Sequence, residues 1–192
     1  MPLSLPNLLT FSRIAVIPLL VAAFYLEDPL GNIVAAALFT LASITDYLDG
    51  YLARAWSQQS NLGRFLDPVA DKLMVSAAIL MMVAFDSIAG WSILAALVIL
   101  CREILVSGLR EFLAEIRVGL PVSRLAKWKT AIQMIALILL LVGDSAPAWM
   151  HAVALGDVAL WIAAALTLIT GYDYLRAGLR HMREDPAAGP AE

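Results

Sequence analysis

Charged residues are scarce in this sequence of 192 residues: they make up 15% of the chain, whereas hydrophobic residues make up 61%. A water-soluble domain carries about a quarter charged residues, so this composition argues against a soluble protein and predicts an integral membrane protein. The net charge of −3 also gives none of the basic surface that nucleic-acid-binding proteins use.

Cysteine is almost absent as well. The chain has a single cysteine, Cys101, so an intrachain disulfide is excluded. Because Cys101 lies within an apolar run, we interpret it as a small buried packing residue. No basic residue precedes Arg13, and the apolar run at 14–26 is followed by further apolar runs. A cleaved signal peptide begins with a positively charged segment, so we do not expect one here.

What the sequence does contain is a series of apolar runs, at 14–26, 33–45, 73–85, 88–101, 131–142 and 152–170. A membrane-spanning helix needs about 20 residues, so most runs must be extended by polar turns at one end. We therefore predict an all-α integral membrane bundle of six transmembrane helices, near 4–26, 31–56, 64–86, 89–116, 122–143 and 152–182. We expect a single domain over 1–185 and a disordered tail over 186–192.

The distribution of basic residues predicts how the bundle is oriented. Three of the predicted turns, Glu27–Gly31, Asp86–Gly90 and Gly143–Pro147, contain no lysine or arginine. With six spans, all thirteen basic residues then lie on the other side of the membrane. The positive-inside tendency assigns that side, with both termini, to the cytoplasm.

The most informative stretch covers residues 46–71 and reads DYLDGYLARAWSQQSNLGRFLDPVAD. Asp46 and Asp49 are three residues apart, and Asp67 and Asp71 are four apart, so each pair shares one face of a helix. Two adjacent antiparallel helices would then present four carboxylates to each other near the membrane surface. Unpaired carboxylates are costly at that depth, and magnesium or manganese suits such oxygen ligands. The stretch therefore predicts a divalent metal site.

Other residues of the same stretch suit a phosphate-bearing ligand. Gly50 and Gly63 leave the backbone accessible to a bulky group, and Arg54 offers a fork of donors for a phosphate. Each residue alone has an ordinary interpretation. Asp67 before Pro68 is typical of a helix N-cap. Arg54 fits a charge that sets membrane topology, and the two glycines fit close packing of helices. The combination at these spacings is what indicates a site.

The spacing resembles the signature of the CDP-alcohol phosphotransferase family. The matching residues are Asp46-x-x-Asp49-Gly50-x-x-Ala53-Arg54, then eight residues, then Gly63-x-x-x-Asp67-x-x-x-Asp71. The resemblance implies a six-helix fold, usually a homodimer, and a site for two Mg²⁺ or Mn²⁺ ions. Of the residues concerned, it implies metal binding by Asp46, Asp49, Asp67 and Asp71, a general base in Asp71, and CDP-diacylglycerol binding by Gly50, Ala53, Arg54 and Gly63.

Segments outside the signature resemble the bacterial branch of the family that uses glycerol 3-phosphate as the acceptor alcohol. They are Pro6–Arg13, Arg102–Ile104, Gly108–Glu111 and Lys127–Thr130 with Gln133. One departure is Ala126, where the resemblance leads us to expect glycine. The resemblance implies transfer of the phosphatidyl group from CDP-diacylglycerol to glycerol 3-phosphate, at the cytoplasmic face of a bacterial inner membrane.

Four basic residues, Arg102, Arg110, Lys127 and Lys129, lie near the cytoplasmic ends of the fourth and fifth predicted helices, where they suit the phosphate of such an acceptor. Some of them fit equally well as topological or lipid-headgroup charges. Lys72 has two possible roles: it could adjust the basicity of the neighbouring Asp71, or it could pair with a lipid phosphate.

Three alternative functions use the same residues. Within the family, the acceptor could be inositol phosphate or phosphatidylglycerol. Aspartate-rich membrane prenyltransferases also combine metal with diphosphate, but they are longer and carry their acidic motifs on distant helices. A small cation transporter would use the four aspartates without needing Arg54 or the glycines.

Overall fold

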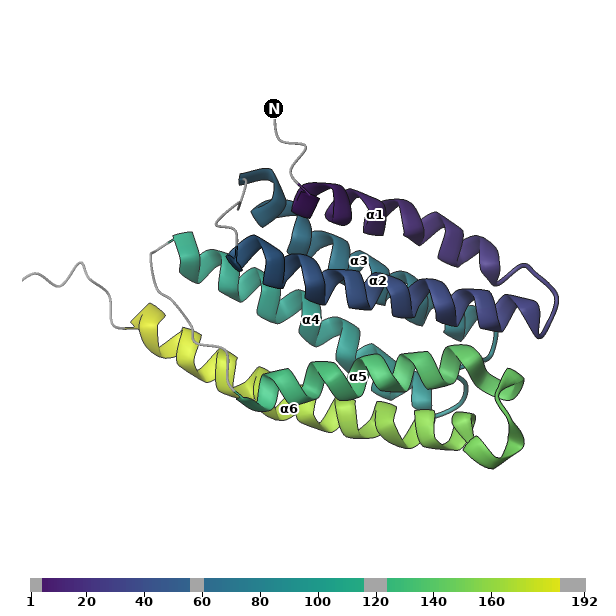
Figure 1. Ribbon diagram of the computed structural model, residues 1–192. Helices are drawn as coiled ribbons and strands as arrows, with labels where there is room; N and C mark the ends of the chain where they lie inside the picture. Colours follow the sequence, from purple (N-terminus) through teal and green to yellow (C-terminus); the bar gives the residue numbers. More distant parts are fainter. Residues whose placement is uncertain (1–4, 56–60, 116–123, 184–192) are drawn as a thin grey trace, which may run out of the picture.

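Six α-helices lie side by side along one long axis in the computed structural model, which describes residues 5–55, 61–115 and 124–183 (Figure 1). The helices are α1 (Leu5–Ala23), α2 (Leu30–Ala55), α3 (Asn61–Ala84), α4 (Ser92–Glu115), α5 (Arg124–Val142) and α6 (Ala152–Arg183). No strand occurs within these described ranges. The all-α prediction is therefore confirmed, and every predicted helix boundary lies within three residues of the observed one.

The connections at one end of the bundle are short turns that need unusual backbone angles. Gly90 and Gly143 have φ angles of +57° and +52°, a region that glycine enters without steric cost. Gly143 follows the last residue of α5 directly, as a helix-ending glycine does. Between α5 and α6 the chain forms two 3₁₀ helices, η1 (Gly143–Ser145) and η2 (Ala148–Met150). The sequence analysis identified this break but not the two 3₁₀ helices within it.

The core contains residues from all six helices. One cluster of buried side chains includes Leu20 on α1, Phe39 on α2, Met74 on α3, Ile99 on α4, Leu137 on α5 and Leu160 on α6, each with no exposed surface. α5 packs along α6 and α2, α1 packs along α2 and α3, and α4 packs along α6. The apolar side chains of six helices thus meet in one interior, which leaves a second set facing outward.

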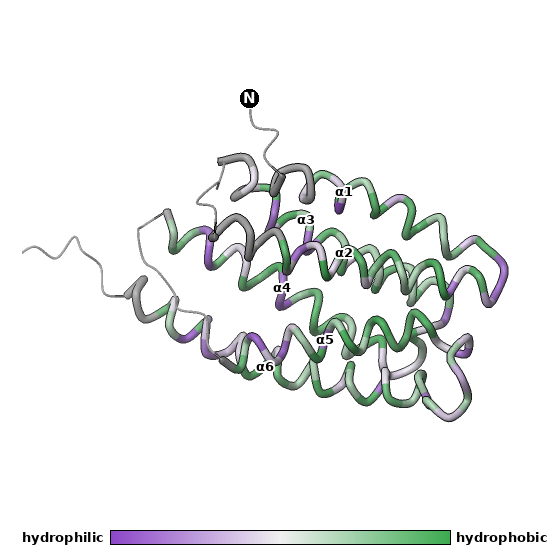
Figure 2. Tube along the Cα trace, in the orientation of Figure 1, coloured by the Kyte–Doolittle hydropathy of each residue, from purple (hydrophilic) through white to green (hydrophobic). Residues whose placement is uncertain are grey.

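The outward faces are also apolar, and Cys101 is exposed on α4, so its interpretation as a buried packing residue is wrong. Leu41, Leu80 and Ile104 are 60%, 67% and 69% exposed, and Figure 2 shows hydrophobic residues along most of each helix, with hydrophilic ones gathered at the turns and in one half of the bundle. By length and composition, three helical segments are suited to cross a membrane: Ser92–Ala114, Leu125–Ser145 and Ala148–Leu179. The membrane prediction is supported by these three, while crossing by α1, α2 and α3 stays a prediction.

The start of α1 and the end of α6 lie at the same end of the bundle, the left end in Figure 1, as expected for an even number of antiparallel helices. Their placement on the cytoplasmic side stays a prediction. The N-cap interpretation of Asp67 is wrong, because α3 already begins at Asn61 and contains Pro68 in its interior.

Candidate active site

A cavity of about 890 Å³ lies between α2, α3, α4, α5 and α6. The charged residues that line it are Asp46 on α2, Asp71 and Lys72 on α3, Arg102, Glu103 and Arg110 on α4, and Lys127 and Lys129 on α5. Two of the predicted metal-binding carboxylates and all four predicted phosphate-binding cations therefore face one space, although they come from three separate stretches of sequence.

The acidic side of this region is organised by Arg13 on α1. The Arg13 side chain is 1% exposed, and its guanidinium donates to the carboxylate of Asp46 on α2 and, over 3.4 Å, to Asp67 on α3. The Thr10 hydroxyl, one helical turn before Arg13, also donates to Asp67. Since the two aspartates are 37% and 44% exposed, they reach solvent on one side while a buried cation holds them together on the other.

This arrangement suits a divalent cation chemically. Asp46 and Asp67 lie on two different helices and direct carboxylate oxygens toward the same cation, the guanidinium of Arg13. Such hard oxygen ligands are those that magnesium and manganese prefer. Among the described side chains, no group of three or more acidic, histidine or cysteine residues is placed to hold a metal ion, and the side chain of Asp49 lies outside the described residues.

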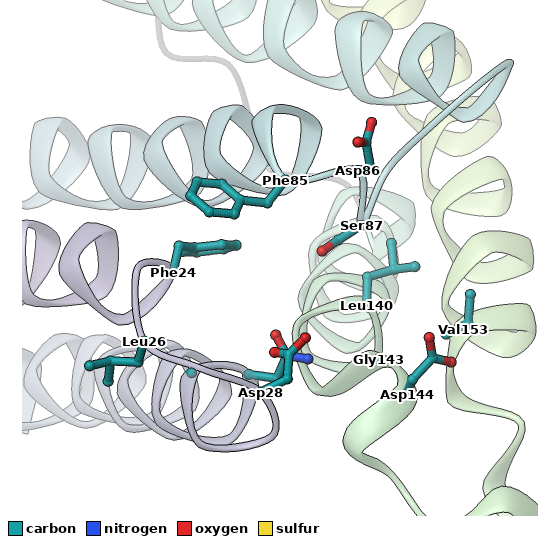
Figure 3. A pocket seen from close by; sticks show the side chains of 12 residues that line it. Phe24, Leu26, Asp28, Phe85, Asp86, Ser87, Leu140, Gly143, Asp144 and Val153 are labelled. Atoms are coloured by element: carbon teal, nitrogen blue, oxygen red, sulfur yellow. The ribbon is translucent and has the colours of Figure 1, made fainter.

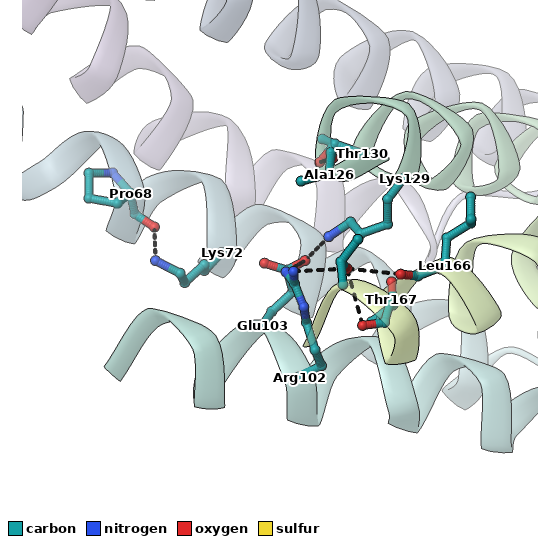
Figure 4. A network of polar contacts seen from close by, with 10 residues as sticks. Pro68, Lys72, Arg102, Glu103, Ala126, Lys129, Thr130, Leu166 and Thr167 are labelled. Atoms are coloured by element: carbon teal, nitrogen blue, oxygen red, sulfur yellow. Dashed lines mark hydrogen bonds and ion pairs between the residues drawn. The ribbon is translucent and has the colours of Figure 1, made fainter. Parts of the chain in front are cut away.

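The basic side of the cavity is organised by Glu103 on α4. Lys129, only 4% exposed, donates its ammonium group to Glu103 Oε1, and Arg102 Nη1 lies 3.4 Å from the same oxygen. Figure 4 shows Glu103 and Lys129 pointing toward each other from α4 and α5. One carboxylate thus pairs with two largely buried cations and offsets part of the cost of placing them at this depth.

Residues of α6 fix the Arg102 side chain in place. Its Nη2 atom donates to Thr170 Oγ1 over 3.1 Å, and its guanidinium carbon lies 5.7 Å from the centre of the Tyr174 ring, a cation–π distance. Gly171 allows this close approach, since a Cβ atom there would lie 3.0 Å from Arg102 Cγ. Arg102 therefore enters the cavity with its orientation already determined by its own chain.

Arg110 and Lys127 differ from this buried pair. Both are exposed at the cavity lining, and neither forms an ion pair within the part of the chain that the structure describes. Lys72 donates to the backbone carbonyl of Pro68 over 3.1 Å. Its ammonium group is therefore held by the backbone and not by another side chain. Of the five cations that line the cavity, two are thus paired with Glu103, one is held by a backbone carbonyl, and Arg110 and Lys127 remain available to an anion.

The remaining predicted site residues belong to α2 and α3. The side chains of Asp49, Ala53 and Arg54, and the surroundings of Gly50, lie outside the described residues, although all four belong to α2. Gly63 is buried near the start of α3.

Four residues of the site escaped the sequence analysis. Thr10 and Arg13 carried a signal, because they lie three apart and so share one face of an otherwise apolar helix. Glu103 entered the sequence analysis only as part of the segment Arg102–Ile104, with no role assigned to it. Tyr174 gave no signal at all, because its role depends on how α6 packs against α4.

A second cavity, of about 420 Å³, lies at the other end of the bundle, where the turns between helices meet. Figure 3 shows Asp28, Asp86 and Asp144 around it, each contributed by a different connection. No lysine or arginine is among the described residues that line it.

These observations define a bundle of helices with apolar segments long enough to cross a membrane. Its large cavity places carboxylates opposite lysines and arginines that suit a phosphate. Comparison with known proteins agrees: the sequence model of the CDP-alcohol phosphatidyltransferase family matches residues 3–169. The chain belongs to this family.

Its relatives include bacterial proteins named CDP-diacylglycerol–glycerol-3-phosphate 3-phosphatidyltransferase. The protein from Rickettsia felis is 48% identical over 174 residues, covering 91% of this chain and 94% of the relative. That from Pseudomonas fluorescens is 44% identical and covers 95% and 94%. That from Pectobacterium atrosepticum is 40% identical and covers 96% and 100%.

Proposed function

We propose that this chain transfers the phosphatidyl group of CDP-diacylglycerol to glycerol 3-phosphate, which yields phosphatidylglycerophosphate and CMP. The observation that carries the proposal is the cavity of about 890 Å³, where Asp46 and Asp71 face Arg110, Lys127 and Lys129. A transfer between two phosphate-bearing substrates needs both an acidic and a basic half in one space. Family membership and the names of the relatives support the same reaction.

In this reaction the primary hydroxyl oxygen of the acceptor attacks the β-phosphorus of the donor. A new oxygen–phosphorus bond forms, and the bond from that phosphorus to the oxygen it shares with CMP breaks. We assign Asp71 as the general base, which takes the proton of the attacking hydroxyl. Arg54, together with Gly50, Ala53 and Gly63, is assigned to the donor's pyrophosphate and nucleoside.

Metal binding is assigned to Asp46, Asp49, Asp67 and Asp71, which would hold two Mg²⁺ or Mn²⁺ ions. Bound there, divalent cations supply neutralising charge for the pyrophosphate and for the attacking and leaving oxygens. The protein's part is to hold the carboxylates close together. Arg13 serves this purpose, because its buried guanidinium fixes Asp46 and Asp67 relative to each other.

The acceptor phosphate is assigned to the basic half of the cavity. Arg110 and Lys127 are exposed, so an incoming phosphate meets them without displacing an internal partner. Lys129 and Arg102 lie deeper and are balanced by Glu103. They add a fixed positive field that favours the dianion once it has entered.

The cellular setting follows from the same proposal. We place all six helices in a bacterial inner membrane, with the charged half of the bundle and both termini toward the cytoplasm, as one domain over 1–185. The lipid chains of the donor then enter from the bilayer while both polar head groups meet at the charged half. We expect two copies of the chain to form a homodimer.

An acceptor panel tests the proposed function. The purified full-length chain in lipid vesicles, supplied with CDP-diacylglycerol and magnesium, is given glycerol 3-phosphate, inositol phosphate or phosphatidylglycerol. We expect CMP release with glycerol 3-phosphate and phosphatidylglycerophosphate as the lipid product. Equal or faster release with another acceptor would contradict the assignment.

A further inference from the structure

A much smaller cavity, of about 40 Å³, adjoins the large one. Both are lined by Asp71, Lys72, Glu103, Lys129, Thr130 and Met134. A water molecule needs about 10–15 Å³ of such space, so the small cavity has room for two or three water-sized groups. A phosphate has five heavy atoms and does not fit. The small cavity is therefore a side pocket of the active site, of a size suited to a hydroxyl group.

Gln133 on α5 lines this side pocket and is 3% exposed. Its Oε1 atom is fully buried and has no hydrogen-bond partner among the described residues. Buried polar atoms nearly always have one, and an amide oxygen can only accept. The ammonium group of Lys129, which lines the same pocket, donates to Glu103 instead. Among the described residues, no donor thus reaches Gln133 Oε1, so a molecule bound in the side pocket can supply one.

The position of Asp71 indicates where such a donor comes from. Asp71 lines both cavities, and under the proposed function it receives the proton of the acceptor's primary hydroxyl. Arg110 and Lys127 line the large cavity, where they meet the phosphate at the other end of the acceptor. In glycerol 3-phosphate the carbon between these two ends carries a second hydroxyl. With the primary hydroxyl at Asp71, this second hydroxyl would lie one carbon away, beside the side pocket that Asp71 also lines.

We propose that the side pocket binds the secondary hydroxyl of the acceptor, which donates to Gln133 Oε1. Gln133 is then a specificity-determining residue that distinguishes a polyol phosphate from a simple alcohol phosphate. The inference rests on the proposed function and adds the part of the substrate that the pocket recognises. A water molecule is the other source of an O–H donor, and the experiment separates the two.

The test compares glycerol 3-phosphate with 3-hydroxypropyl phosphate, which keeps the primary hydroxyl and the phosphate but lacks the secondary hydroxyl. The full-length chain in lipid vesicles is assayed for CMP release with each acceptor. We expect the wild type to prefer glycerol 3-phosphate by about 10- to 100-fold in kcat/KM, because the analogue leaves a buried acceptor unpaired. In Gln133→Met this preference should fall below about threefold, because kcat/KM decreases for glycerol 3-phosphate and stays nearly unchanged for the analogue.

Thr167→Val is the matched control. Thr167 is also fully buried and its Oγ1 atom also has no partner among the described residues, but it lies outside the lining of both cavities. This variant should keep the wild-type preference. Melting temperatures in detergent show whether each variant is folded, and Gln133→Leu replaces the methionine variant if that one is not. The wild-type comparison needs no variant at all.

Each other outcome is decisive. If the wild type uses both acceptors equally well, the secondary hydroxyl is not recognised and the inference is overturned. If Gln133→Met keeps the full preference, recognition lies elsewhere, which also overturns it. If the variant loses activity equally with both acceptors, the pocket holds water rather than the acceptor. A wild type that does not use glycerol 3-phosphate at all contradicts the proposed function instead.

Discussion

The two ends of the bundle each enclose a cavity with acidic side chains, yet only one of them also carries cations. At the end where short turns meet, Asp28, Asp86 and Asp144 surround about 420 Å³, and none of the described lining residues is basic. At the other end, Asp46 and Asp71 share about 890 Å³ with lysines and arginines from three helices. The difference lies in what carries the charge: connections at one end, helices at the other.

The physical cost of charge explains this difference. The three aspartates of the turns are exposed, so water compensates them and no protein partner is needed. A charge that is buried inside the bundle loses that hydration and must be paired, as Arg13 is with Asp46 and Lys129 with Glu103. A helix that retains costly charges indicates function more strongly than an acidic turn does. Four experiments can break or sharpen this comparison.

Removal of divalent cations is expected to have the largest effect. Excess EDTA should abolish CMP release, and added magnesium or manganese should restore it, because carboxylates without metal cannot stabilise the charge on the reacting oxygens. The measurement is CMP release in lipid vesicles before and after metal is returned. Full activity in excess EDTA would contradict the assigned metal site.

Asp71→Asn should lower kcat by about a hundred- to ten-thousand-fold, since the amide keeps the shape of the side chain but cannot accept the proton. Asp86→Asn is the control at the other end of the bundle. Asp86 has a φ angle of +59°, which asparagine tolerates, so this variant keeps its backbone and should stay within twofold of the wild type. Loss of activity in both variants, or in neither, would remove the distinction between the two cavities.

Lys127→Gln and Arg110→Gln should each raise the KM for glycerol 3-phosphate by about ten- to a hundredfold and leave that for CDP-diacylglycerol nearly unchanged. The reason is the loss of one charge-assisted contact to the acceptor phosphate, worth about 1.5–3 kcal/mol. Arg176→Gln is the control, because Arg176 is exposed on α6 and lies outside the cavity lining. If all three variants behave alike, the basic residues serve topology rather than substrate binding.

The helices could be predicted from the sequence because their determinants are local. Apolar runs and the breaks at Asp86–Gly90 and Gly143–Pro147 locate helix ends within three residues of those observed. The sequence also indicates that Arg102 needs a negatively charged partner, because it lies within an apolar segment. In the structure Glu103 is that partner.

Which helix faces which other helix could not be predicted, and three features of the site depend on it. Arg13 lies between Asp46 and Asp67 only because α1 packs against both α2 and α3. The contact of Tyr174 with Arg102 requires that α6 lie along α4. The side pocket at Gln133 depends on side-chain packing among α3, α4 and α5, which no spacing in the sequence reveals.

The smallest expected effect concerns stability rather than turnover. In Glu103→Gln the largely buried Lys129 and Arg102 lose the carboxylate that forms an ion pair with both. Breaking a fully buried pair costs about 3–5 kcal/mol. Glu103 is 23% exposed, so we expect about 1–3 kcal/mol and a melting temperature lower by about 2–4 °C for each kcal/mol lost.

Two charge-neutralising variants complete this last comparison. Glu111→Gln removes an exposed carboxylate from the same helix, and Asp144→Asn removes one from the cavity at the other end. Both carboxylates are hydrated by water, so neither change should move the melting temperature by more than about 1 °C, in line with the small effect of surface substitutions. Thermal unfolding in one detergent compares all three variants directly. If Glu103→Gln melts together with these two, solvent rather than Glu103 balances the cations of the large cavity, and the contrast between helix-borne and turn-borne charges no longer holds.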